Sequence, residues 1–229
     1  MHWGTVMRFS KFLLSGAFPE GPLGGLLLTL ELSLVAGVGS FAVGLVFGLC
    51  RVSRFKLIRI IATIYVEVVR GIPFIMALFW FYFLFPRLVG LQMTEVQSAL
   101  IALTFFFGAY ATEIVRAGIL SVPRGQTEAA LATGLNSLQL MIYIVLPQAF
   151  RNMIPSFVNL YVSLIKDTSL AYFIGVVELT GAATQVMRRE SAATFEIFVF
   201  ILVIYLLLCS ALNALSDKLE HRFAIAVKH

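Results

Sequence analysis

The sequence contains few charged residues. Asp, Glu, Lys and Arg make up 13% of its 229 residues, whereas hydrophobic residues make up 60%. Soluble domains are about half apolar and a quarter charged, so this composition excludes an ordinary soluble protein and indicates an integral membrane protein. The net charge of +5 does not indicate nucleic-acid binding, because the basic residues occur in short clusters beside apolar runs. Loops on the cytoplasmic side of a membrane have this composition.

Patterns typical of metal and nucleotide sites are also missing. The two cysteines, Cys50 and Cys209, are far apart and belong to apolar runs, so we interpret them as helix-packing residues. No glycine is followed by lysine anywhere in the chain, which excludes the phosphate-binding loop of many ATPases. We therefore expect no catalytic residue, no metal and no bound cofactor, and any ATP that is used must be hydrolysed by a partner chain.

Five segments are long and apolar enough to cross a membrane, which requires about 20 mostly apolar residues. We place these spans at residues 23–49, 60–85, 96–120, 148–177 and 195–215. No internal repeat or linker separates them, so we expect one all-α transmembrane domain over residues 1–229. Five spans put the termini on opposite sides. The excess of Lys and Arg in loops such as 51–59 places the N-terminus outside and the C-terminus inside.

Two features near the N-terminus carry further predictions. Residues 1–22 only superficially resemble a signal peptide, because prolines and an acid interrupt the apolar run, so we expect an interfacial lead-in of the mature chain. Small residues then recur at every fourth position of the first span. Such a face lets another helix approach closely and predicts a helix contact; its members are Ala36, Ser40, Gly44 and Gly48.

The second and third spans contain paired charges. Glu67 with Arg70, and Glu113 with Arg116, are three residues apart, so each pair shares a helix face and is interpreted as a structural ion pair. Pro73 is interpreted as a simple kink, since membrane helices tolerate proline. The alternative is a broken helix that aims one terminus at an anionic substrate.

The fourth span carries a polar stripe at helical spacing. Charges at membrane depth cost at least about 2.5 kcal/mol each on insertion scales, so we expect this stripe to face the bundle interior or a water-filled path. A free amino acid brings an ammonium and a carboxylate, which a stripe with both signs of charge could match. The alternative is that Lys166 and Asp167 pair with each other, and that this pair only allows a polar helix to lie within the membrane. The predicted substrate-path residues are Asn159, Ser163, Lys166, Asp167, Thr168 and Ser169; Asn152 and Ser156 extend the stripe.

The segment 121–147 has the composition of short soluble helices. We expect Thr127 to cap a helix that begins at Glu128, and Gly134 to end it in a left-handed turn. Ser137 would cap a second helix, which Pro147 closes. Two capped helices make a rigid lever between spans, and their small residues suit docking into a protein groove. An amphipathic helix lying on the lipid surface is the alternative.

These residues also resemble a known motif. Glu128-Ala129-Ala130, followed by Gly134 and by Leu146-Pro147, is similar to the EAA motif of ABC-transporter permease subunits. Flanking segments at 113–119, 123–126 and 146–151 extend the resemblance. Residues 69–73 and 166–170 resemble segments of the polar amino-acid uptake branch of these importers. Ala117 is a departure, because the branch often has a glycine there.

The resemblance implies a five-span permease of type I ABC importer architecture in a bacterial inner membrane. Its implied partners are a second permease subunit, identical or related, two ATPase subunits that bind ATP and Mg, and an extracytoplasmic amino-acid-binding protein. Its coupling residues would be Glu128, Ala129, Ala130 and Gly134. We expect a polar amino acid such as glutamate, aspartate or glutamine as substrate. An ion-coupled carrier or channel is the alternative function, and a membrane scaffold is a third.

Overall fold

The computed structural model describes residues 2–226, and within that range it consists of helices and short connections, with two isolated β-bridges. Helices satisfy their own backbone hydrogen bonds, as an apolar membrane requires. In chain order the elements are α1 (Trp3–Ser15), α2 (Gly25–Arg51), α3 (Lys56–Arg70), α4 (Phe74–Phe79), η1 (Trp80–Leu84), α5 (Phe85–Val89), α6 (Glu95–Leu120), α7 (Arg124–Ala132), α8 (Ser137–Gln139), η2 (Leu140–Val145), α9 (Leu146–Thr168), η3 (Ser169–Ile174), α10 (Leu179–Arg189), η4 (Ser191–Ala193) and α11 (Thr194–Ala226).

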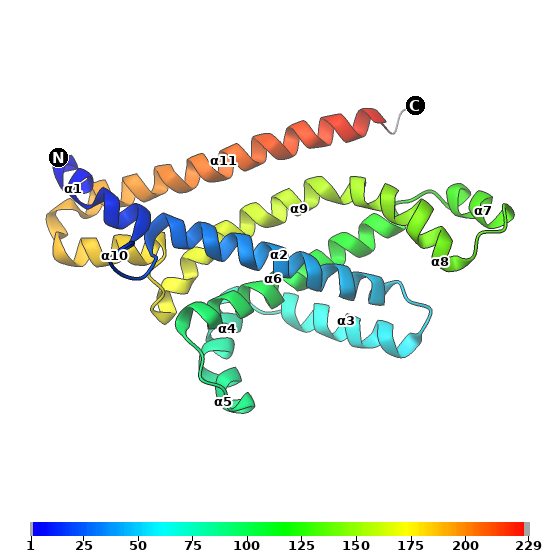
Figure 1. Cartoon of the computed structure of the whole chain (residues 1–229), viewed down its shortest axis with the longest axis horizontal. Helices are drawn as coiled ribbons and strands as arrows, with labels where there is room; N and C mark the ends of the chain where they lie inside the picture. The colour runs from blue at the N-terminus through cyan, green and yellow to red at the C-terminus, as the bar shows by residue number, and fades with distance from the viewer. Residues whose placement is uncertain (1, 227–229) are drawn as a thin grey trace.

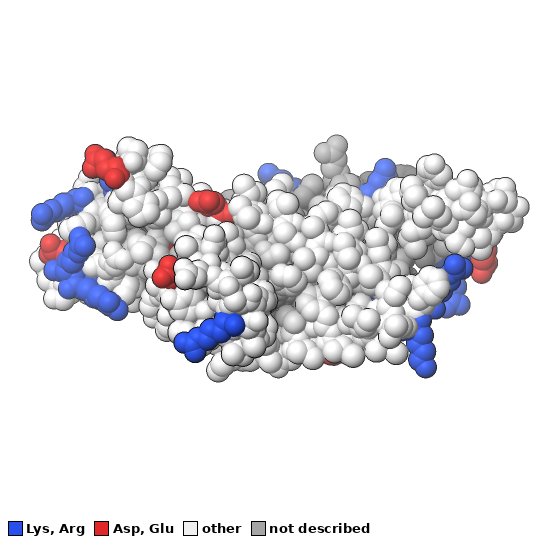
Figure 2. Space-filling view, turned by 60° about the horizontal axis from the view of Figure 1, so that its bottom comes forward, with Lys and Arg blue, Asp and Glu red and all other residues white. Residues whose placement is uncertain are grey.

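The molecule is elongated, and its long helices run roughly along one axis (Figure 1). The loop between α2 and α3 lies at the same end as α7 and α8, whereas α1 and α10 lie at the opposite end. Figure 2 shows a broad band of uncharged side chains across the middle of one face, with most charged residues toward the two ends. An apolar band between charged ends is the surface that a bilayer requires.

Three helices are apolar and long enough to cross a membrane by themselves: α2, α6 and the segment Ser191–Lys218, which includes most of α11. They correspond to the predicted spans 23–49, 96–120 and 195–215. A fourth crossing is counted if the bent pair Lys56–Arg70 and Phe74–Val89 is one span. The amphipathic helix α9 occupies most of the predicted span 148–177, but it ends at Thr168.

The predicted span 60–85 is not one helix. Its two parts, α3 and the segment that begins with α4, meet at an angle of 106°. Pro73 has no N–H to donate and disfavours helical backbone at Ile72, so it ends α3 and starts α4 instead of bending a continuous helix. The interpretation of Pro73 as a simple kink is therefore wrong, and α3 ends at Arg70.

The helix α2 packs most extensively against α6. A Cβ atom added at Gly44 would collide with Ala111, and one added at Gly48 would collide with Val115. Larger side chains at these positions would force the two backbones apart. The predicted helix-contact face of α2 is confirmed, because all four of its members are buried: Ala36, Ser40, Gly44 and Gly48.

A buried carboxylate joins three helices at the α1 and α10 end. Glu178 caps α10 by accepting hydrogen bonds from the N–H groups of Thr180 and Gly181, at 3.0 and 2.9 Å. It also accepts from the hydroxyl groups of Tyr205 on α11 (3.1 Å) and Thr29 on α2 (3.4 Å). A buried carboxylate needs such donors to replace lost water. The four bonds therefore fix α10 against α2 and α11.

The helical backbone continues from α8 through the π-helical turn η2 into α9. Pro147 follows this turn inside the continuous helical run, where it has no N–H to donate to the preceding turn. The prediction that Pro147 closes the second short helix is therefore wrong. Figure 1 shows that α8 and α9 run in different directions. A proline next to a π-helical turn is a common cause of such a bend.

Candidate functional site

A polar cavity with a volume of about 610 Å³ lies between α6 and α9. Tyr110 and Glu113 contribute to the α6 wall, and Arg70 contributes from the end of α3. Ala117 and Gly118 continue the α6 wall toward α7, where the side chain of Met153 packs against Gly118. The two main walls are therefore α6, which precedes α7 and α8 in the sequence, and α9, which follows them.

Four members of the predicted polar stripe line the α9 wall of this cavity: Asn152, Ser156, Asn159 and Ser163. Lys166 and Asp167 follow on the same helix but do not line it. The side chain of Lys166 is exposed and that of Asp167 is half-buried. Among residues 2–226, whose structure is described, no ion pair joins them, so the alternative of an internal Lys–Asp pair finds no support.

The hydroxyl groups of the predicted path donate mostly within their own helical turns. Ser163, Thr168 and Ser169 each donate to a backbone carbonyl three or four residues earlier, at 3.2, 2.7 and 2.6 Å. Thr168 is fully buried. One stripe residue bonds to the opposite wall, because the side-chain amide of Asn152 donates to the hydroxyl of Ser121 at 2.9 Å. This contact joins α9 to the C-terminal end of α6 near α7.

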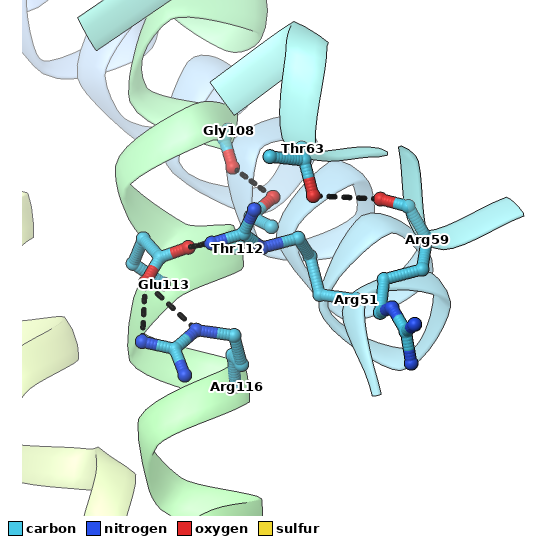
Figure 3. A network of polar contacts seen from close by, with 7 residues as sticks. All are labelled: Arg51, Arg59, Thr63, Gly108, Thr112, Glu113 and Arg116. Atoms are coloured by element: carbon cyan, nitrogen blue, oxygen red, sulfur yellow. Dashed lines mark hydrogen bonds and ion pairs between the residues drawn. The ribbon is translucent and has the colours of Figure 1, made fainter. Parts of the chain in front are cut away.

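A three-residue ion-pair network lies beside the cavity (Figure 3). One carboxylate oxygen of Glu113 accepts from Arg51 at 2.7 Å, and the other accepts from Arg116 at 2.9 Å. The predicted Glu113–Arg116 pair is confirmed, and Arg51 at the end of α2 is an additional partner that the sequence did not predict. The side chains of Arg51 and Glu113 are only 13% and 19% exposed, so this pair is largely shielded from water.

The predicted ion pair between Glu67 and Arg70 does not form within the described part of the chain. The Arg70 guanidinium instead lies 5.2 Å from the centroid of the Tyr110 ring, an arrangement in which the aromatic face attracts the cation. Arg70 is also the last residue of α3, where unpaired carbonyl groups favour a positive charge. The interpretation of Glu67 and Arg70 as a structural ion pair is therefore wrong.

The helix α7 begins earlier than predicted. Its N-cap is Pro123, and the hydroxyl of Thr127 donates to the carbonyl of Arg124 at 2.7 Å instead of capping the helix. The prediction that Thr127 caps a helix starting at Glu128 is wrong, because Pro123, with φ −59° and ψ 137°, takes the N-cap position four residues earlier. Glu128 and Ala129 are exposed, whereas Ala130 is buried.

The connection from α7 to α8 contains the predicted left-handed turn. Gly134 has φ of +88°, which confirms this prediction, and a Cβ added there would meet no atom within 4 Å. Asn136, not Ser137, caps α8, because its side chain accepts from the N–H groups of Leu138 and Gln139. The segment therefore contains two helical stretches joined by a left-handed turn, as predicted, but with different capping residues.

Two residues, one beside the cavity and one in its lining, could not be recognised from the sequence. Arg51 belongs to a basic cluster that is typical of any cytoplasmic loop, and its partner Glu113 is 62 residues away. Tyr110 occupies an aromatic-rich stretch that is equally typical of a packed core. Among the described residues, no group of three or more His, Cys, Asp or Glu side chains could hold a metal ion.

Comparisons with known proteins concern nearly the whole chain. A family described as "binding-protein-dependent transport system inner membrane component" matches residues 40–225. The L-cystine transport system permease protein TcyB of Bacillus subtilis is 36% identical over 199 residues, which cover 87% of this chain and 85% of that protein. The glutamate/aspartate import permease protein GltK of Escherichia coli is 35% identical over 229 residues, covering 97% and 98%. A chain in the crystal structure of an amino acid ABC transporter with histidines has a TM-score of 0.79 and 30% identity, covering 86% of this chain and 92% of that one.

Proposed function

Because the chain belongs to the family of binding-protein-dependent transport system inner membrane components, we propose that it forms half of the pathway by which an ABC importer moves a polar amino acid inward. The chain is a permease subunit, a multi-pass protein of the bacterial inner membrane. It is a transport subunit and not an enzyme, since ATP is hydrolysed on a separate ATPase chain.

One observation carries the proposed mechanism: the α7–α8 segment directly connects the two helices that form the walls of the polar cavity. A force applied to this segment acts on α6 at one end and on α9 at the other. Of the coupling residues, Glu128, Ala129 and Gly134 dock into the ATPase partner, and Ala130 packs this segment against its own chain. The exposure of Glu128 and Ala129 supports this docking.

The substrate path follows the polar face of α9. Asn159 and Ser163 form its section inside the cavity, which is supported by their place in the lining. Lys166, Asp167, Thr168 and Ser169 form its outer section, where the helix ends and η3 begins. Thr168 acts there through the backbone of its turn, because its side chain is buried.

The single domain crosses the membrane five times, by α2, the broken α3–α5 segment, α6, α9 and α11. The N-terminus is outside and the C-terminus inside. This topology is supported by the basic cluster that connects α2 to α3, which lies at the α7 end of the molecule (Figure 1). It places the docking segment in the cytoplasm and Glu178 near the outer surface.

The functional assembly contains a second permease subunit, two ATPase subunits that bind ATP and Mg, and an extracytoplasmic binding protein. The exposed edge of the cavity, formed by residues such as Arg70 and Ser163, supports a second subunit that completes the path. Glutamate, aspartate or glutamine is the substrate. The import permease GltK, aligned over 97% of this chain, is named for glutamate and aspartate.

Reconstitution tests this function. The chain should copurify with an ATPase subunit, and proteoliposomes should take up labelled glutamate only when both internal ATP and the loaded binding protein are present. Uptake driven by an ion gradient in the absence of ATP would instead support the carrier alternative. A permease with an inactive ATPase partner, which cannot hydrolyse ATP but still assembles, is the matched control.

A further inference from the structure

We infer that Arg70 binds a carboxylate of the transported solute, so that the cavity between α6 and α9 selects anionic amino acids. This inference rests on the proposed function and specifies the substrate class of the same cavity. It follows from three features of Arg70: its depth in the proposed topology, its lack of a carboxylate partner, and the positive charge that it leaves uncompensated in the cavity.

In the proposed topology, Arg70 lies near the middle of the membrane. Its guanidinium lies over the ring of Tyr110, which is ten residues before the last residue of α6, Leu120. At a rise of 1.5 Å per residue this is about 15 Å from the cytoplasmic end of α6, or half of a hydrocarbon core that is about 30 Å thick. An ionised side chain at that depth requires a partner or a function.

No carboxylate within the described residues pairs with Arg70. The other charged residue that lines the cavity, Glu113, already uses both oxygens for Arg51 and Arg116. Glu67, one turn earlier on α3, does not reach Arg70. Arg70 is therefore the cation of this cavity whose carboxylate partner is not supplied by the described chain.

The immediate contacts of Arg70 suit a carboxylate ligand. The guanidinium lies over the Tyr110 ring, 5.2 Å from its centroid, and no carboxylate of the described chain occupies its N–H groups, which can bind both oxygens of one carboxylate. The break in the chain at Pro73 ends α3 directly after this residue, so no further helical turn covers it. Asn159 and Ser163, on the opposite wall, supply further polar groups.

The charge around the cavity favours an anion over a zwitterion or a cation. The charged residues in the lining are Arg70 and Glu113, and Glu113 is already neutralised by Arg51 and Arg116, which lie outside the lining. Arg70 is therefore an excess positive charge at the cavity. An acidic amino acid brings one net negative charge and reduces this excess, whereas a cationic amino acid would increase it.

A binding assay on the assembled transporter tests this inference. The permease with its ATPase partners is placed in lipid nanodiscs without the binding protein, and radiolabelled L-glutamate is titrated. Competition is measured with glutarate, which has two carboxylates and no ammonium, and with 1,4-diaminobutane, which has no carboxylate. The variants are R70Q, R70K, which keeps the charge but loses the planar fork, and R87Q, a matched control on the exposed helix α5.

We expect R70Q to weaken glutamate binding at least about tenfold, R70K to weaken it less, and R87Q to leave it unchanged. Glutarate should compete and diaminobutane should not. The inference is overturned if R70Q and R70K bind glutamate like the unmodified protein, if diaminobutane competes as well as glutarate, or if the unmodified transporter prefers arginine to glutamate.

Two controls separate this inference from the proposed function. The R70Q complex should copurify with its ATPase partners and elute at the same volume as the unmodified complex in size-exclusion chromatography, which shows that the variant assembles; if R70Q does not assemble, R70K decides the test. Failure of the unmodified complex to take up any amino acid with ATP and binding protein would overturn the proposed function. Normal uptake with unimpaired binding by both Arg70 variants would overturn this inference alone.

Discussion

Replacing Glu113 with glutamine should weaken the junction between α2 and α6 by about 3 kcal/mol, the lower end of the range for breaking a shielded ion pair. The carboxylate accepts two charge-assisted hydrogen bonds, at 2.7 Å from Arg51 and 2.9 Å from Arg116. Glutamine has nearly the same shape and keeps one acceptor oxygen, so no cavity forms. The loss arises because the Arg51 guanidinium, 13% exposed, remains in place without a counter-charge.

The matched comparison is R116Q. Arg116 is 34% exposed, and its removal leaves Glu113 paired with Arg51, so the expected loss is at most about 1 kcal/mol. The thermal unfolding midpoint of the purified transporter in detergent measures both variants. With about 2–4 °C per kcal/mol for a chain of this size, E113Q should lower the midpoint by roughly 6–12 °C and R116Q by only a few degrees.

A double variant identifies the source of the loss. If an orphaned arginine causes it, R51Q combined with E113Q should be more stable than E113Q alone, because the unpaired charge has been removed. The reasoning is refuted if E113Q and R116Q lower the midpoint equally. It is also refuted if the double variant loses as much as the two single variants added together.

Three further substitutions test other parts of the structure. Gly134→Val places a β-branched residue at φ +88°, which costs about 1–2 kcal/mol locally. It should lower the number of amino-acid molecules taken up per ATP hydrolysed. An unchanged ratio in proteoliposomes argues against the coupling role. Asp167→Asn should reduce the uptake rate at least about tenfold with assembly intact, and full uptake with unchanged selectivity would remove this residue from the path. Glu178→Ala leaves four hydrogen-bond donors without an acceptor and should destabilise the transporter by about 2–4 kcal/mol. The measurement is a lowered thermal unfolding midpoint. An unchanged midpoint would mean that water replaces the carboxylate.

Patterns with a regular period were sufficient to predict much of the fold. The four-residue spacing of small residues that includes Gly44 and Gly48 specified the face of α2 that packs on α6, since close approach depends only on side-chain size. The same regularity placed Asn152 and Ser163 on one face of α9, and both line the cavity. These features follow from helical geometry alone and need no knowledge of a distant partner.

Features that depend on competition between local signals were harder to predict. Pro123 and Thr127 are both acceptable N-cap residues, and the structure uses Pro123, so that α7 begins at Arg124. Pro73 is compatible with a kink or with a break, and the accompanying Gly71 and the packing of α4 favoured the break. The Arg51–Glu113 pair joins residues 62 apart in sequence, so it depends on the register between α2 and α6 and on no local pattern.

The glycine-mediated contact between α2 and α6 also limits how the walls of the cavity can move. Sliding or tilting α6 against α2 would bring Ala111 and Val115 onto backbone that has no room for them, so this pair behaves as a stationary frame. The same holds where α9 meets α6, because a Cβ added at Gly118 would collide with Met153. A change of access that keeps these contacts would therefore move α2, α6 and this part of α9 together as one body.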